Sequence, residues 1–213
     1  MERYWINVNS LIYWFARLLC RLVFTIGNGL TVYGVENIPR NGPVIVVANH
    51  SSLLDGFVLT ACLPRKITYF SSAYLFDLPL VGPFLCSIGA IPVEKNEGGV
   101  TAVKKALKVL GEGGSLGIFP EGGVRPEGKL RDLQPGWAYL ALKSGAPVLP
   151  VAIRGSSTVL PPGARIPRRG RITVVIGKMQ YRPRELRPGR EAMTVVNTWL
   201  IQELECLLEY KSS

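Results

Sequence analysis

Short apolar runs alternate with helical patterns along most of the chain. Runs rich in β-branched and aromatic residues predict buried strands near residues 30–35, 44–48, 67–70, 115–119, 148–153 and 172–176. Apolar positions at helical spacing predict helices at 53–62, 100–110 and 137–143, and a last helix at about 191–210. Because strands and helices alternate, we predict an α/β fold, a single domain whose mixed, mainly parallel sheet is flanked by helices.

The amino-terminal segment has a different pattern. Residues 11–26 are mostly apolar, but Arg17 and Arg21 interrupt them on one face of the helix. An arginine at the centre of a bilayer costs about 2.5–3.5 kcal/mol, and the uninterrupted apolar runs are shorter than the ~20 residues of a span. A signal peptide also fits poorly, because the arginines interrupt its apolar core.

We therefore expect residues 1–28 to be a helical segment in a membrane interface, with aromatic and leucine side chains in the apolar layer and the arginines at the phosphates. The alternative is a core helix with two exposed arginines. The domain itself is predicted to occupy residues 29–213.

Composition favours an anionic partner. The chain has 213 residues with 47% hydrophobic content, which suits one domain with a substantial core and excludes a disordered polymer. Its 25 Lys and Arg against 15 Asp and Glu give a net charge of +10. Nucleic acid, a phosphate-bearing substrate and an acidic membrane all fit this charge, and the mean hydropathy of +0.22 favours the membrane. The most basic stretch, residues 161–171, reads as an exposed loop with three prolines and four arginines.

The cysteines give no sign of a metal site. The four cysteines are scattered without C-x-x-C spacing and lie in apolar contexts, so buried, reduced thiols are expected. With a single histidine in the chain, a zinc site is not expected.

That histidine, His50, is the strongest candidate for chemistry, because imidazole is the side chain that serves most readily as a base near neutral pH. His50 follows the predicted strand 44–48 directly, where α/β proteins commonly bind ligands. Positions five apart on a helix point about 140° away from each other, so His50 and Asp55 can meet only if His50 precedes the helix and Asp55 lies in its first turn. Asp55 would then fix the imidazole tautomer. The alternative is a capping box at 52–55 with a purely structural role.

Four strings resemble the motifs of the glycerolipid acyltransferases, the family that contains the bacterial 1-acylglycerol-3-phosphate acyltransferases. They are NHSSLLD at 49–55, which matches NHxxxxD, GAIPVEK at 89–95, FPEG at 119–122 and VLPVAI at 148–153. The resemblance spans roughly residues 30–180, and NHxxxxD paired with FPEG is specific. Two positions depart from the family pattern. Lys95 stands where the family usually has arginine, and Arg125 is displaced by one residue from the family's Thr-Arg-Ser continuation of FPEG.

The resemblance implies a role for each of these residues. It implies that His50 is the general base, that Asp55 orients it, and that Glu121 and Gly122 bind the glycerol phosphate acceptor. Lys95 and Arg125 are the candidate phosphate-binding cations. Without the resemblance, Glu121 would read as a solvent-exposed turn carboxylate and the two cations as surface residues.

We predict an acyltransferase that moves a fatty acyl group from acyl-CoA or acyl carrier protein to the sn-2 hydroxyl of 1-acylglycerol 3-phosphate, giving phosphatidic acid. It would be peripheral or monotopic at the cytoplasmic face of an anionic membrane, with no resident metal or cofactor and no nucleic-acid partner. Two alternatives stay open. The acceptor could be glycerol 3-phosphate or another lysolipid, or the chain could be a non-catalytic basic module that binds lipid or nucleic acid.

Overall fold

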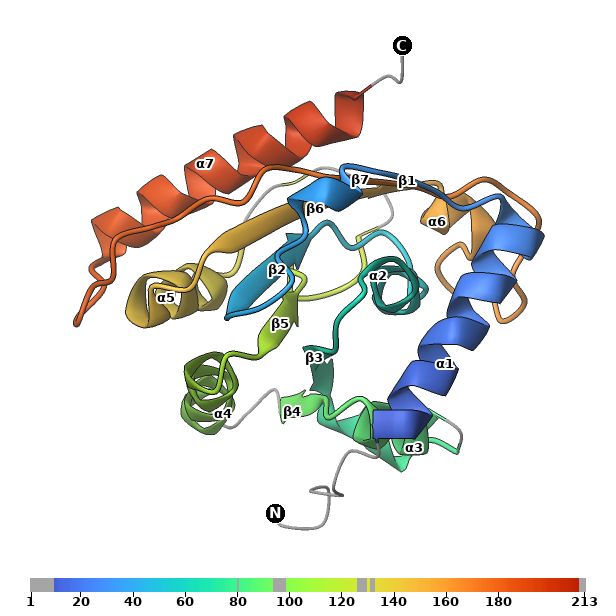
Figure 1. Cartoon of the computed structure of the whole chain (residues 1–213), viewed down its shortest axis with the longest axis horizontal. Helices are drawn as coiled ribbons and strands as arrows, with labels where there is room; N and C mark the ends of the chain where they lie inside the picture. The colour runs from blue at the N-terminus through green and yellow to red at the C-terminus, as the bar shows by residue number, and fades with distance from the viewer. Residues whose placement is uncertain (1–9, 80, 94–98, 126–129, 131–132, 211–213) are drawn as a thin grey trace.

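The computed structural model describes residues 10–79, 81–93, 99–125, 130 and 133–210 (Figure 1). The strands are β1 Thr31–Tyr33, β2 Val44–Ala48, β3 Ile67–Ser72, β4 Ile91–Val93, β5 Ser115–Ile118, β6 Val148–Arg154 and β7 Thr173–Ile176. The α-helices are α1 Ser10–Leu22, α2 Asp55–Cys62, α3 Val81–Ser87, α4 Val100–Gly111, α5 Pro135–Ser144, α6 Ser156–Val159 and α7 Arg190–Glu209. A π-helical turn, η1 Val23–Gly27, continues α1, and short 3-10 helices occur at η2 Val35–Asn37 and η3 Ala73–Asp77.

The strands form one seven-stranded sheet in the order β1-β7-β6-β2-β5-β3-β4. Neighbouring strands are parallel except for β6 and β7, which are antiparallel. The predicted fold class, a single α/β domain with a mixed, mainly parallel sheet, is therefore confirmed.

Helices cover both faces of the sheet (Figure 1). Strand β2 is buried on both sides, and its side chains point alternately to the two faces of the sheet. Val44, Val46 and Ala48 belong to one apolar cluster, and Ile45 and Val47 belong to the other. The first cluster includes side chains of α1, α2 and α3, and the second those of α4, α5 and α7. The central strands are thus held from both sides, and only their ends are open to a ligand.

Some short elements escaped the sequence prediction. Strand β4 has three residues with a proline at its centre, and α3 contains Gly82-Pro83, so local patterns argue against both elements. Helix α6 has only four residues. In each case the tertiary contacts of a short segment outweigh its weak local preference.

Helix α1 packs against the domain through a stripe that includes Tyr13. This side chain is fully buried, and its hydroxyl donates to the Arg65 carbonyl (3.1 Å) and accepts the Ile67 N–H (3.2 Å). Arg17 lies on the same side, where its Nε donates to the Leu63 carbonyl at 2.8 Å. Arg17 thus caps a carbonyl at the end of α2 through its Nε, and the placement of the two arginines at lipid phosphates stays a prediction. In the described part of the chain, no helix is long and apolar enough to cross a bilayer.

The opposite side of α1 is apolar and exposed. Leu11, Phe15, Leu18 and Leu22 follow one another at helical spacing and are 78%, 69%, 53% and 49% exposed. A continuous exposed stripe of large apolar side chains is rare on the surface of a monomeric soluble protein. We call these four residues the outer stripe.

All four cysteines are free thiols, but they are not all buried as expected. Cys62 is buried, Cys20 and Cys86 are half-buried, and Cys206 is exposed. Cys206 lies on the solvent side of α7, two residues after Leu204, which is buried with Leu200 on the opposite side of the helix.

Candidate active site

Two neighbouring parallel strands deliver the candidate residues to one edge of the sheet. Strands β2 and β5 are paired so that Val47 lies opposite Ile118. His50 follows the end of β2 by two residues, and Glu121 follows the end of β5 by three. Because both strands point the same way, these two turns meet at the carboxyl edge of the sheet, where α/β folds commonly bind ligands.

His50 and Asp55 form a direct pair. The Nδ1 atom of His50 lies 3.0 Å from Oδ2 of Asp55, which is fully buried, while the imidazole is 16% exposed. The backbone N–H groups of Ser51 and Ser52 donate to the same Oδ2 at 2.7 and 2.8 Å. Since a carboxylate oxygen only accepts, Nδ1 carries the hydrogen of this bond, and Nε2 of the neutral ring is left with a lone pair.

The predicted turn geometry explains why the pair can form. Helix α2 begins at Asp55, so His50 stands before the helix and Asp55 in its first turn. The two hydrogen bonds from Ser51 and Ser52 are of the kind that an acidic residue makes at a helix start. Only the carboxylate half of the predicted capping box is present, because the Ser52 hydroxyl accepts the Leu54 N–H (3.3 Å) and the Asp55 N–H donates to the Ser52 carbonyl. The Asp55 carboxylate holds the turn and the imidazole together.

An aromatic stack supports the imidazole from one side. The ring of Phe119 lies 4.1 Å from the ring of His50, with an angle of 18° between the planes. Tyr69 lies parallel beyond Phe119, with ring centroids 6.4 Å apart. Gly117 makes room for this layer, because a Cβ there would lie 2.4 Å from the Tyr69 ring. The stack restrains the plane of the imidazole ring, and the hydrogen bond to Asp55 restrains its rotation within that plane.

Glu121 is buried, so the interpretation as a solvent-exposed turn carboxylate was wrong. It is 5% exposed, and its Oε1 accepts the backbone N–H of His50 at 3.1 Å. Its Oε2 has no hydrogen-bond partner among the described residues. Burial raises the pKa of the Glu121 carboxyl, and the N–H groups of Glu121 itself and of His50 oppose that rise. The turn after β5 thus places a desolvated carboxyl group against the turn that carries His50.

The structure brings most of the predicted site residues together. The Arg125 backbone N–H donates to the His50 carbonyl at 2.8 Å, and its guanidinium lies 3.4 Å from the Glu121 carbonyl. Gly122 has φ +71°, a conformation that favours glycine. Lys95 lies outside the described residues. Despite its displacement by one position, Arg125 therefore belongs to the same cluster as His50 and Glu121.

Sequence reasoning did not anticipate the role of Asn49. Its buried side chain donates to the Ile153 carbonyl at 2.9 Å and accepts the Ile153 N–H at 2.7 Å, in place of a backbone ladder. The Asn49 side chain thus continues the pairing of β2 with β6 by one more residue after the last backbone pair, Ala48 and Val151. The signal available in the sequence was an asparagine directly after a predicted buried strand, since a buried amide needs hydrogen-bond partners.

Ser51 and Ser52 anchor the same turn to the next segment of the fold. The Ser51 and Ser156 hydroxyls lie 3.0 Å apart, and the Ser52 hydroxyl donates to the Leu160 carbonyl at 2.9 Å. Both serine side chains are buried and engaged, which favours a structural role over a nucleophilic one.

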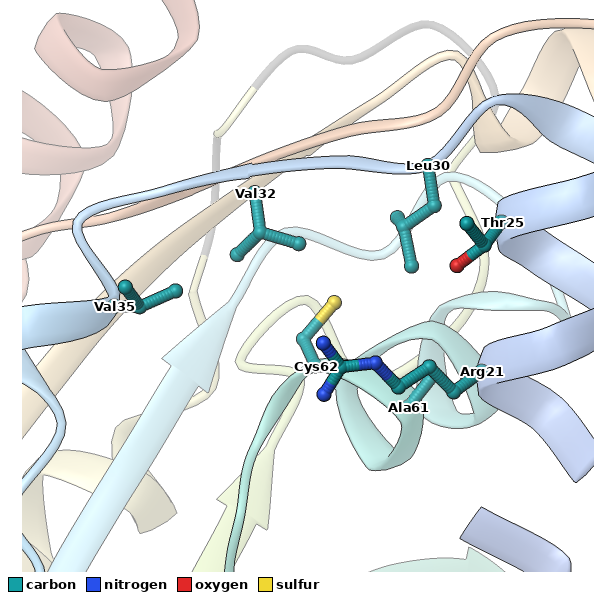
Figure 2. Close-up of a pocket in the computed structure, with 7 residues that line it drawn as sticks. All are labelled: Arg21, Thr25, Leu30, Val32, Val35, Ala61 and Cys62. Atoms are coloured by element: carbon teal, nitrogen blue, oxygen red, sulfur yellow. The ribbon is translucent and has the colours of Figure 1, made fainter. Parts of the chain in front are cut away.

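A cavity of about 340 Å³ lies apart from this cluster, between α1, β1 and α2 (Figure 2). It is lined by Arg21, Thr25, Leu30, Val32, Val35, Ala61 and Cys62. Cys62 is the last residue of α2 and Asp55 the first, so about 10 Å of helix separates the cavity from the imidazole pair. Burial raises the pKa of the Cys62 thiol to about 12, which leaves it protonated and unreactive near neutral pH.

Comparison with known proteins agrees with the geometry. A family model described as Acyltransferase matches residues 29–154, a span that includes all six predicted site residues. The chain belongs to the acyltransferase family. It is 30% identical over 202 residues to the 1-acyl-sn-glycerol-3-phosphate acyltransferase of Bacillus subtilis (strain 168), an alignment that covers 92% of this chain and 98% of the relative. The family indicated by the sequence motifs is thus confirmed.

Two further matches place this acyltransferase within the family. It superposes with a TM-score of 0.77 and 26% identity on the crystal structure of the 1-acyl-sn-glycerophosphate (LPA) acyltransferase, PlsC, from Thermotoga maritima, covering 95% of this chain and 82% of that one. The chloroplastic 1-acyl-sn-glycerol-3-phosphate acyltransferase LPAT1 of Arabidopsis thaliana is 29% identical over 153 residues, which are 70% of this chain and 43% of the relative. The similarity to the Thermotoga maritima structure extends beyond the short motifs to the architecture that positions them.

Replacing Glu121 by Gln is expected to stabilise the protein above neutral pH. Because burial raises the pKa of the carboxyl, the native state binds its proton more tightly than the unfolded state. Stability then falls as the pH rises from the usual glutamate range through the raised pKa, and the amide removes this loss while keeping an oxygen for the His50 N–H. We expect a gain of about 1 kcal/mol by urea unfolding at pH 8, the scale of one buried unpaired polar group, and none at pH 3.

The exposed Glu205→Gln is the matched control and should change the free energy of unfolding by less than about 0.5 kcal/mol at either pH. A Glu121→Gln protein that is less stable than wild type at pH 8 would contradict this account of the buried carboxyl.

Proposed function

We propose that this acyltransferase transfers a fatty acyl group from a thioester, acyl-CoA or acyl carrier protein, to the sn-2 hydroxyl of 1-acylglycerol 3-phosphate. The observation that carries the proposal is the His50–Asp55 pair, with Nδ1 bonded to the carboxylate at 3.0 Å and Nε2 left as a base. The names of the relatives with which the chain aligns over most of its length support this acceptor.

The chemistry requires a single proton shuttle. Nε2 of His50 takes the proton of the acceptor hydroxyl as that oxygen attacks the thioester carbonyl carbon. A tetrahedral intermediate forms, the carbon–sulfur bond breaks, and the thiolate leaves with the proton returned by the imidazolium. The products are the new ester and a free thiol. Asp55 keeps the ring in the required tautomer and stabilises the imidazolium, so no nucleophilic side chain is required.

The turn after β5 is proposed to hold the acceptor. Glu121 accepts the backbone N–H of His50, and Gly122 follows Glu121 in the turn. Arg125 is bonded to the His50 carbonyl through its backbone N–H, so its guanidinium would contact a phosphate bound at this turn. Arginine binds phosphate through two parallel N–H donors, which would orient the acceptor hydroxyl toward His50. Lys95 stays a predicted second cation.

We also propose that the outer stripe of α1 lies in the apolar layer of a membrane interface. Its four side chains are exposed, whereas the opposite side of the helix is packed on α2. A helix with one face fixed to a domain and an apolar stripe facing outward is suited to lying in the interface plane. The acyltransferase would then meet its lipid acceptor at the cytoplasmic surface of the membrane.

Substitutions of His50 and Asp55 test the chemistry. His50→Ala should lower thiol release from acyl-CoA with detergent-dispersed lysophosphatidic acid by about 10²–10⁴-fold, the contribution of a general base. Asp55→Asn should lower it by at least about 10²-fold, because an amide can donate to Nδ1 and favours the wrong tautomer. Glu205→Gln, at an exposed position of α7 away from this turn, is the control and should stay within about threefold of wild type.

Folding of each variant is checked by urea unfolding. Full activity of a folded His50→Ala protein would exclude the base, and activity with glycerol 3-phosphate alone would change the acceptor while keeping the mechanism. If wild type were inactive with every thioester and lyso-acceptor, the non-catalytic module would be the better account.

Substitutions in the outer stripe test membrane binding. Changing Phe15, Leu18 and Leu22 together to Ser should weaken binding to phosphatidylcholine vesicles by at least about tenfold, because the apolar surface that enters the interface is lost. The matched control changes Val100, Leu186 and Val195 to Ser, three apolar residues that are 63%, 74% and 60% exposed elsewhere on the molecule. Sedimentation with vesicles measures both proteins, and an equal loss in the two would contradict the proposed orientation.

A further inference from the structure

A second surface of the molecule has a composition unlike its surroundings. In the basic loop, residues 161–171 between α6 and β7, all four arginines are exposed: Arg165, Arg168, Arg169 and Arg171. Ile166 stands among them and is 79% exposed. The sequence has no acidic residue from 133 to 184, and none of the four arginines forms an ion pair with any residue that the structure describes. This concentration of uncompensated positive charge attracts an anionic partner.

The basic loop is fixed beside the end of the amino-terminal helix. Asn28, which follows the π-helical turn and is 8% exposed, donates to the Arg168 carbonyl at 3.2 Å. The Asn28 carbonyl in turn accepts the Ile172 N–H at 3.3 Å, and the Arg168 N–H donates to the Val159 carbonyl at 2.7 Å. Ile26, two residues before Asn28, is 82% exposed. The basic loop and the carboxyl end of the amino-terminal helical segment are therefore joined through one buried amide and lie side by side (Figure 1).

The same loop is connected to the catalytic turn. Ser52 donates to the Leu160 carbonyl at the start of the loop, and Ser51 contacts Ser156 in α6. Hydrogen bonds thus connect the basic loop both to Asn28, which follows the amino-terminal helix, and to the turn that carries His50. A partner that binds the loop would therefore lie next to the segment that anchors this turn.

We propose that the basic loop binds the headgroups of anionic phospholipids and that it docks with the outer stripe on one lipid surface. This proposal rests on the membrane binding put forward above and adds its lipid selectivity. Three features favour a lipid surface over an acidic protein: the continuity of the loop with an uncovered apolar helix, the lone apolar Ile166 among the arginines, and the fixed geometry between loop and helix. The helix supplies affinity for any bilayer, and the loop supplies the preference for negative charge.

Two sets of charge substitutions distinguish the contribution of the loop arginines to binding from that of the net charge of the protein. The loop variant carries Arg165→Gln, Arg168→Gln and Arg169→Gln, and the matched control carries Lys104→Gln, Arg187→Gln and Arg190→Gln. Each variant loses three positive charges at exposed positions, and the control positions lie at α4, before α7 and at its start, away from the loop (Figure 1). The bonds that hold the loop at Arg168 come from its backbone, so the substitution leaves them in place.

Binding is measured by sedimentation with vesicles of phosphatidylcholine alone or mixed with phosphatidylglycerol. An arginine near an anionic surface strengthens binding by a factor of about five. We expect the loop variant to lose at least about tenfold in affinity for the mixed vesicles, with little change on phosphatidylcholine alone, and the control to change by less than about twofold. Wild-type binding to mixed vesicles should weaken with added salt, and this dependence should be smaller for the loop variant.

Equal losses in the two variants, or none in either, would overturn the proposal. It would also be overturned if the loop variant kept its affinity for mixed vesicles but lost transfer from acyl carrier protein and not from acyl-CoA, because the loop would then dock the protein donor. Activity with detergent-dispersed lysophosphatidic acid is measured alongside. An inactive wild type would count against the proposed function alone, and vesicle binding would still decide the role of the loop.

Discussion

One carboxylate oxygen holds the turn that carries His50 in place. Oδ2 of Asp55 accepts the N–H groups of Ser51 and Ser52 and faces Nδ1 of His50, so the helix start, the turn and the imidazole share a single acceptor. Because Asp55 is fully buried, none of these bonds competes with water. Any change that moves this carboxylate alters the backbone of the turn and the position of the imidazole together.

The sheet positions the turns that carry His50 and Glu121, and two buried oxygens of this site lower the stability of the fold. Parallel pairing of β2 and β5 places the two turns side by side, and Asn49 ties β2 to β6 just before they separate. Oδ1 of Asp55 and Oε2 of Glu121 are buried without a partner among the described residues. Unpaired buried carboxylate oxygens destabilise a fold, and their presence at one cluster is typical of a site selected for function.

The sequence predicted what depends on local pattern and missed what depends on distant contacts. Periodicity found the buried strand at 44–48 and most helices, and the five-residue spacing of His50 and Asp55 was enough to predict a pair across a helix start. The stack of Phe119 on His50 and the bond from Asn28 to the basic loop were not predictable, since they join segments 69 and 140 residues apart. Arg17 shows the same limit, because its spacing did not predict the bond to a carbonyl 46 residues away.

The tautomer of His50 is the most direct test of the account. The chain has one histidine, so a long-range proton–nitrogen correlation spectrum of the nitrogen-15-labelled protein contains a single imidazole. The account predicts a neutral ring protonated at Nδ1 in wild type, and loss of that pattern in a folded Asp55→Asn protein. A wild-type ring protonated at Nε2, or an unchanged spectrum in the variant, would contradict the claim that Asp55 prepares His50 to act as a base.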